Sequence, residues 1–226
     1  MKAGYFITGT DTGVGKTLVS SALVHGFAGK GYKAIGMKPV AAGCSRQGNR
    51  LISEDVAQLM AASNVTTSLD LINPYAFEPA IAPHIAAAQA GVDIEIKIIQ
   101  DAYRQLSGLA EVVVVEGVGG FIVPLGARLD TADLAQELDL PVILVVGMRL
   151  GCLSHALLTA EAIQGRGLSL AGWVANRIDP DMSAYAENLE ALQQRLPAPC
   201  LGVVPWAAAP HFKSTAASLA LEKLGI

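Results

Sequence analysis

The sequence contains few aromatic residues and few cysteines, and it has no excess of positive charge. Aromatic residues make up 5% of the chain and hydrophobic residues 52%, so the interior must be mainly aliphatic, as in a buried parallel sheet. The three cysteines, Cys44, Cys152 and Cys200, lack the spacing of a metal site or a disulfide framework, which indicates reduced thiols. The formal net charge of -4 argues against a basic surface for nucleic acid.

Long hydrophobic segments are also missing. No apolar run approaches the roughly 18 residues of a membrane span, and Asp11 interrupts the first apolar stretch before a signal-peptide core could form. We therefore expect a cytoplasmic protein that acts on small molecules and binds neither membrane nor nucleic acid. The 226 residues suit one α/β domain, and no linker or repeat divides them, so residues 1–226 are expected to form a single domain.

Short apolar runs alternate with segments of helical periodicity along most of the chain. This alternation predicts an α/β fold with a mostly parallel sheet and helices on both faces, and it places ligands beyond the carboxyl ends of the strands. Residues 41–90 fit the pattern less well, because prolines interrupt them repeatedly, and we expect loops and short helices there. The predicted strands are 3–8, 112–115, 142–146, 170–175 and 200–204, and the predicted helices are 17–28, 131–138, 154–164 and 184–195.

The segment Gly9–Thr17 (GTDTGVGKT) lies between the first predicted strand and the first predicted helix. Glycines allow backbone N–H groups to turn around a phosphate, and the helix N-terminus adds a favourable dipole. Lys16 can neutralise phosphate oxygens, and the hydroxyl of Thr17 is suited to a bound Mg²⁺. The loop is a variant of the usual pattern, with Thr10 in place of the first glycine and Gly9 just before it. These features predict a fold of the P-loop NTPase type.

Several further motifs accompany this loop. With them, the chain resembles the dethiobiotin synthetase family over essentially its whole length. The matching segments are 36–41 (GMKPVA) after a second strand, 73–75 (NPY), 83–84 (PH), 115–120 (VEGVGG), 150–152 (LGC), 171–176 (AGWVAN) and 205–206 (PW).

The resemblance implies an ATP-dependent ligase of biotin biosynthesis that uses Mg²⁺. In this family, 7,8-diaminopelargonic acid reacts with CO2 to give a carbamate, ATP phosphorylates the carbamate, and ring closure yields dethiobiotin, ADP and phosphate. The resemblance also implies a homodimer with the substrate site at the interface. Chemistry of this kind depends on positioning two anions, so the protein must supply cations rather than a covalent nucleophile.

Two lysines and three oxygen donors are the candidates for this chemistry. Lys16 and Lys38 both follow predicted strands and are the expected catalytic residues, with Lys38 matching the active-site lysine of the family. Mg²⁺ prefers oxygen ligands, and the expected ones are Thr17, Asp55 and Glu116. The assignment of Asp55 as a Mg²⁺ ligand depends mainly on the resemblance, because an acid at this position is equally suited to the start of a helix. Its neighbour Glu54 is the alternative ligand.

The nucleotide site predicted from the motifs extends over several loops. The resemblance implies that Asn176 binds the adenine edge, but residues 176–179 (NRID) also resemble the guanine-recognition element of GTPases, which leaves the choice of base open. The expected nucleotide-binding residues are Gly13, Val14, Gly15, Lys16, Thr17, Leu18, Asp55, Glu116, Gly117, Val118, Gly119, Asn176, Arg177, Pro205, Trp206 and Ala207.

The expected substrate-binding residues include two departures from the family. Ala42 stands where a serine is common, so a contact there would use the backbone. Ser154 stands where an asparagine is common, and we expect it to cap the helix from Leu153 onward. A role for His84 stays open. The full set is Thr12, Ala42, Gly151, Cys152 and Ser154.

Two other functions share features with this sequence. A nucleotide-switched ATPase of the ParA and MinD type shares the strand, loop and helix plan, but its signature lysine would fall at Asp11. An amide-forming enzyme of the same superfamily usually carries a glutamine-hydrolysing domain, which this sequence lacks.

Overall fold

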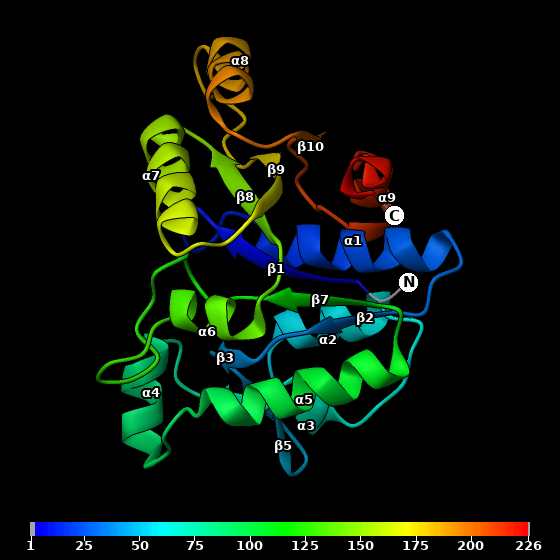
Figure 1. The fold of residues 1–226 in the computed structure, drawn as a ribbon, viewed down its shortest axis with the longest axis vertical. Helices are drawn as coiled ribbons and strands as arrows, with labels where there is room; N and C mark the ends of the chain where they lie inside the picture. Colours follow the sequence, from blue (N-terminus) through cyan, green and yellow to red (C-terminus); the bar gives the residue numbers. More distant parts are fainter. Residues whose placement is uncertain (1–2, 226) are drawn as a thin grey trace.

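A computed structural model describes residues 3–225 of the chain. Its central sheet has six strands in the order β10-β9-β8-β1-β7-β2, and every pair of neighbours is parallel (Figure 1). This confirms the α/β prediction. The strands are β1 (Ala3–Gly9), β2 (Ala34–Met37), β7 (Val112–Glu116), β8 (Val142–Met148), β9 (Leu170–Arg177) and β10 (Cys200–Val204).

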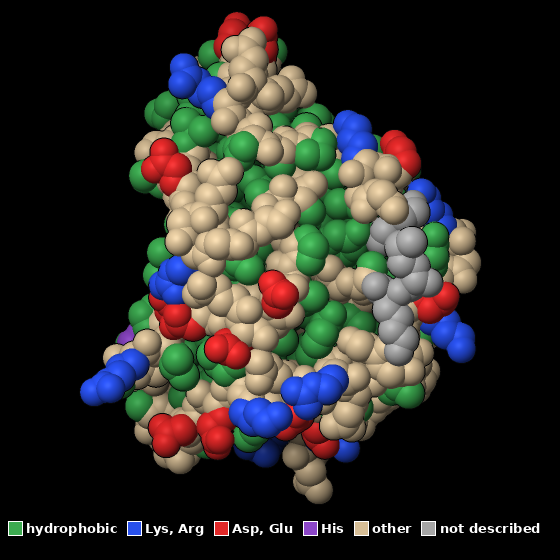
Figure 2. Space-filling view, in the orientation of Figure 1, with side chains coloured by type: hydrophobic (Ala, Val, Ile, Leu, Met, Phe, Trp, Pro, Cys, Tyr) green, Lys and Arg blue, Asp and Glu red, His purple; other side chains and the backbone are tan. Residues whose placement is uncertain are grey.

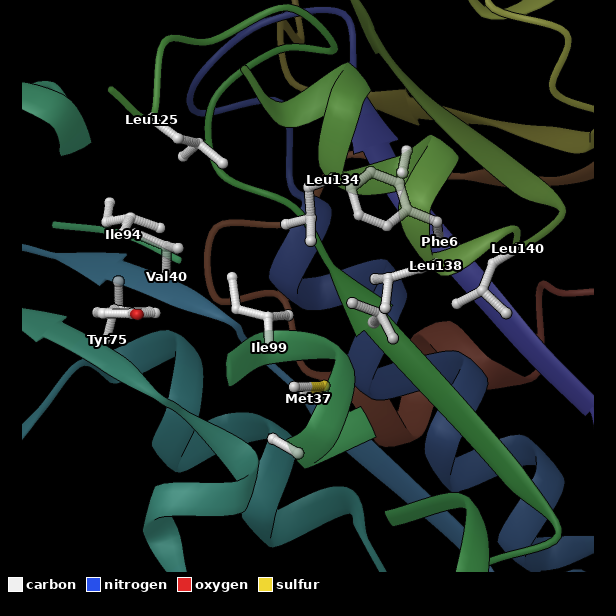
Figure 3. Packing of buried hydrophobic residues seen from close by; sticks show 14 of the residues in the cluster. Phe6, Met37, Val40, Tyr75, Ile94, Ile99, Leu125, Leu134, Leu138 and Leu140 are labelled. Carbon is white, nitrogen blue, oxygen red and sulfur yellow. The ribbon is translucent and has the colours of Figure 1, made fainter. Parts of the chain in front are cut away.

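Alternate residues of the central strands point to opposite faces of the sheet. In β1, Tyr5 and Ile7 point to one face and pack in a hydrophobic cluster with buried residues of α1. Phe6 points to the other face and packs with Leu134 and Leu138 of α6 (Figure 3). The buried side chains are mostly aliphatic, as the composition predicts. The helices are α1 (Lys16–Gly29), α2 (Glu54–Ala62), α3 (Leu69–Ile72), α4 (Pro83–Ala90), α5 (Ile96–Leu109), α6 (Thr131–Leu138), α7 (Cys152–Gly165), α8 (Tyr185–Arg195), α9 (Phe212–Ala216) and a 3-10 turn, η1 (Leu221–Leu224).

Residues 41–90 contain more regular structure than the sequence predicts. Besides short helices, they include part of a parallel pair, β3 (Val40–Ala42) with β6 (Tyr75–Phe77), and a hairpin of β4 (Ser45–Gln47) and β5 (Arg50–Ile52). Strands of three residues give almost no periodic signal, and the β3–β6 pair joins segments more than 30 residues apart. The expectation of loops and helices alone was therefore wrong for this region.

The outer surface carries charges of both signs. On the face shown in Figure 2, acidic and basic side chains are interspersed. Among residues 3–225, no helix is both long and apolar enough to cross a membrane. The loops that follow the carboxyl ends of β1, β2 and β7 contain residues of the motifs 9–17, 36–41 and 115–120, and they meet because these three strands are neighbours in the sheet.

Candidate active site

The phosphate loop joins β1 to α1 with its backbone turned by glycines. Gly15, just before α1, has φ 89°, a left-handed conformation that glycine adopts without strain. A Cβ at this position would also collide with Nδ2 of Asn176. No side chain of residues 3–225 caps the first turn of α1, and that turn has no acidic residue. Its N–H groups therefore form a site suited to an anion.

A cavity of about 930 Å³ lies in front of this loop. It collects residues from the loops after β1, β2 and β7, from the start of α2 and from the segment before α4. The predicted site residues that line it are Thr12, Gly13, Gly15, Lys16, Thr17, Lys38, Ala42, Asp55, Glu116, Val118 and Gly119.

Lys38 is the best-buried cation of the site, with 3% of its side chain exposed. Its Nζ donates to Glu116 Oε1 at 2.6 Å and to the Gly117 carbonyl at 2.9 Å, and it lies 3.0 Å from Asp55 Oδ2. The register of β2 and β7 brings these groups together, because Met37 pairs with Val115 one residue earlier. Burial alone would lower the pKa of Lys38, but the charges of Glu116 and Asp55 outweigh it and raise that pKa. Lys38 is therefore charged at neutral pH.

Three oxygen donors converge beside Lys38. The Thr17 hydroxyl lies 2.7 Å from Asp55 Oδ1 and 2.9 Å from Glu116 Oε1. Glu116 Oε2 is buried and has no hydrogen-bond partner within residues 3–225. Burial alone would raise the pKa of Asp55, but the Lys38 charge and the hydrogen bond from Thr17 lower it. The cluster thus presents a hydroxyl and two carboxylates, one of which has an oxygen left unpaired.

Helix α2 selects Asp55 rather than Glu54 for this cluster. Ser53 caps the helix by accepting from the Val56 N–H, and both acids lie in its first turn. Glu54 is exposed, whereas Asp55 faces Thr17 and Lys38. The sequence allowed Asp55 to be either an acid at a helix start or a residue of the site. The structure shows that it is both, because it lies in the first turn of α2 and lines the cavity.

Lys16 is 7% exposed, and its Nζ donates to the Asp11 carbonyl at 2.9 Å. Burial, followed by the nearby charge of Lys38, lowers its pKa to about 8, even though Glu116 and Asp55 act in the opposite direction. The two lysines of the site thus differ. Lys38 has carboxylate partners, whereas the charged form of Lys16 is disfavoured by its burial and by the nearby charge of Lys38.

The remaining predicted nucleotide-binding residues lie outside this cavity. Asn176 ends up against the phosphate loop, where its Nδ2 donates to the Val14 carbonyl at 2.8 Å. Arg177 donates to the carbonyls of Asp179 and Pro180, and its guanidinium lies 4.7 Å from the ring centroid of Tyr185. The other residues outside the cavity are Val14, which is buried, Leu18, Gly117 and the exposed Pro205, Trp206 and Ala207.

The start of α7 differs from the prediction for Ser154. The helix begins at Cys152 with Gly151 as its N-cap at φ 93°, and no side chain caps it within the described part of the chain. The left-handed glycine starts the helix early, so Ser154 already lies in the first helical turn and cannot be its cap. The expected capping role was wrong. Gly151 and Ser154 are exposed, Cys152 is buried, and all three lie outside the cavity.

The apolar walls of the cavity are not evident from the sequence. They come from the segment before α4 and from the loop after Gly120. Such residues have no chemical signature, and the only hint was the proline and histidine pair at 83–84. Pro83 lines the cavity and His84 does not. The buried Nδ1 of His84 has no hydrogen-bond partner among the described residues. The residues that were missed are Ala80, Ile81, Ala82, Ile122 and Val123.

The parallel sheet and the glycine-turned loop before α1 place the chain in the P-loop NTPase class. A family model described as AAA domain matches residues 3–211. The fold is similar to that of the septum site-determining protein MinD of Pyrococcus horikoshii complexed with Mg-ADP, with TM-score 0.57 and 17% identity over 99% of this chain and 89% of that one. The fold is also similar to that of a ParA family ATPase of Chlorobium tepidum, with TM-score 0.57 and 11% identity over 99% of this chain and 96% of that one. These identities show the fold alone.

Comparison with curated sequences is more specific. The chain is 58% identical over 217 residues to the ATP-dependent dethiobiotin synthetase of Aromatoleum aromaticum, covering 96% of each chain. It is 54% identical over 206 residues to that of Nitrosospira multiformis, covering 91% of this chain and 89% of the relative. The chain belongs to the family of ATP-dependent dethiobiotin synthetases.

Proposed function

We propose that this protein makes dethiobiotin from 7,8-diaminopelargonic acid, CO2 and ATP. Besides family membership, the observation that supports this is the presence of two buried lysines and a cluster of carboxylates in one cavity. The reaction needs a site that holds a polyphosphate next to a second anion, the carbamate, and no residue has to act as a nucleophile. Lys16 and Lys38 are our candidates for the catalytic groups.

The proposed sequence begins with the carbamate formed from one amine of the substrate and CO2. An oxygen of the carbamate attacks the γ-phosphorus of ATP, and ADP leaves. The second amine then attacks the carbonyl carbon of the resulting anhydride, loses a proton and expels phosphate as the ring closes. Lys16, at the start of α1, would hold the phosphates, and Lys38 would stabilise the charge that develops between carbamate and γ-phosphate.

The donor set of the cavity suits Mg²⁺. Thr17, Asp55 and Glu116 supply oxygen ligands of the kind that this hard cation prefers, and Glu116 Oε2 is buried without a partner within residues 3–225. When bound, Mg²⁺ supplies neutralising charge for the outer phosphates. We infer that these three residues would hold it.

The apolar walls suit the hydrocarbon chain of the substrate. Ala42, Ile81, Pro83 and Ile122 line the same cavity as the lysines. They would bury the methylene groups while the amines face the polar end near Thr12. Since Ala42 has no hydroxyl, recognition there would rest on its backbone and on packing.

The base-binding part of the nucleotide site would lie beyond the cavity, on the far side of the phosphate loop. Asn176 is held against Val14, and Arg177 is fixed by the loop that follows it. We infer that Asn176 faces the base and that Pro205, Trp206 and Ala207 flank it. The name of the family favours ATP.

Formation of product tests the proposal directly. The purified chain, incubated with 7,8-diaminopelargonic acid, bicarbonate, Mg²⁺ and ATP, is expected to release dethiobiotin and ADP in equal amounts, measured by mass spectrometry. Omitting the diamine is the control, and it should suppress ADP release. A folded protein that gives no dethiobiotin would disprove the function. Replacing ATP with GTP in the same assay measures the choice of base.

We also infer a homodimer. On and beside α7, Leu150 is 92% exposed and Leu158 is 61% exposed, and Ile122 at the cavity is 57% exposed. Exposed apolar side chains that gather into one patch commonly mark an interface. In such a dimer, the Gly151–Ser154 turn of one copy would lie over the cavity of the other and bind the substrate carboxylate.

Sedimentation of the wild-type protein should show a dimer. The double variant Leu150→Lys/Leu158→Lys should sediment as a monomer. A monomeric wild-type protein would contradict the inference.

Two further expectations remain part of the proposal. We infer that residues 1–226 form one domain around the six-stranded sheet. We also infer a cytoplasmic location, because Cys44, Cys152 and Cys200 are all free thiols, as a reducing compartment would keep them.

A further inference from the structure

An ion pair joins the phosphate loop to the loop after β8. Arg149 directly follows β8, and its guanidinium lies 2.5 Å from Asp11 Oδ2. Backbone contacts bring the two loops together, since the Thr10 N–H donates to the Val145 carbonyl at 3.0 Å and the Gly147 N–H lies 3.3 Å from the Thr10 hydroxyl. Strands β1 and β8 are neighbours in the sheet, so this arrangement follows from the topology.

Asp11 is an unexpected residue on the wall of a cavity that must accept a polyphosphate. Its carboxylate also accepts from the Thr12 N–H at 2.7 Å, and its carbonyl accepts from Lys16 at 2.9 Å. The hydrogen bond from Thr12, together with the charge of Arg149, lowers the pKa of Asp11. The carboxylate is therefore negative at neutral pH, and unless it is neutralised it would repel the phosphates.

We propose that Arg149 is a positioning residue that neutralises Asp11 and thereby allows a triphosphate to bind beside it. The two side chains are 42% and 46% exposed, and ion pairs this exposed contribute little to stability. The effect of the pair should therefore appear in nucleotide affinity rather than in folding. The proposal rests on the proposed function only in taking ATP as the ligand.

The test compares MgATP affinity, measured by calorimetry without the diamine, so it does not depend on dethiobiotin formation. Arg149→Gln is expected to bind MgATP about tenfold more weakly at low salt, because it exposes the Asp11 charge. Asp11→Asn combined with Arg149→Gln removes that charge and should return the affinity to within about threefold of the wild type. Arg149→Lys keeps the charge and should stay within about twofold.

Three controls make the result specific. Arg104→Gln removes an arginine from a comparable exposed ion pair with Asp101 on α5, outside the cavity, and should leave affinity unchanged. Raising the salt concentration should reduce the deficit of Arg149→Gln. Unfolding midpoints of all variants should stay within a few degrees of the wild type. The proposal is overturned if Arg149→Gln binds like the wild type, if it fails to fold, or if the double variant stays as weak as Arg149→Gln.

Discussion

Replacing Lys38 with methionine is expected to lower kcat by about 1,000-fold, the upper range for loss of one preorganised charge at a transition state. The same change should lower the free energy of unfolding by about 3 kcal/mol, because it leaves Glu116 fully buried and Asp55 close to it without their cation. Turnover assays with saturating substrates and denaturant unfolding measure the two effects.

Lys38→Arg separates chemistry from folding. The arginine keeps a charge beside Glu116, so the unfolding free energy should fall less than in Lys38→Met. Its planar guanidinium places that charge differently, and kcat should still fall by about tenfold or more. If a folded Lys38→Met turned over at the wild-type rate, Lys38 would have no catalytic role, whereas a well-folded Lys38→Arg at the wild-type rate would contradict only the required position of the charge.

Lys16→Gln is expected to weaken MgATP binding by about 100-fold through loss of a charge-assisted contact to phosphate. Stability should not fall, because the lowered pKa of Lys16 shows that its charged form is disfavoured in the folded protein relative to the unfolded chain. Calorimetry and thermal unfolding provide the two measurements. Loss of Lys38 should thus lower the free energy of unfolding and loss of Lys16 should not, although both lysines are buried.

The pH dependence of binding provides a second readout for Lys16. With a pKa of about 8, Lys16 is charged below that pH and loses its proton above it. Phosphate requires the charged form, so wild-type affinity for MgATP should fall by about twentyfold between pH 7.5 and pH 9.5. Lys16→Gln has no proton to lose there and should show a flatter profile. A wild-type affinity that stays constant over this range would contradict the assignment.

The fold followed from the sequence wherever the signal was local. Strands such as Val112–Glu116 are continuous β-branched runs, and a glycine marks the turn before α1, so both could be recognised from neighbouring residues. The parallel pair of β3 and β6 could not, because its pairing depends on segments far apart in the chain. Helix α7 began before Ser154 for a related reason, since the backbone conformation of Gly151 overrode the capping preference of the serine.

The sequence by itself determined the chemical groups of the site, namely a glycine-rich phosphate loop, two lysines that follow strands and acids suited to Mg²⁺. The tertiary structure decided how these groups are paired. Only the adjacency of β2 and β7 places Lys38 between Glu116 and Asp55, and only the adjacency of β1 and β8 places Arg149 on Asp11. Pairing of this kind depends on distances in space, which strand order fixes and residue order along the chain does not.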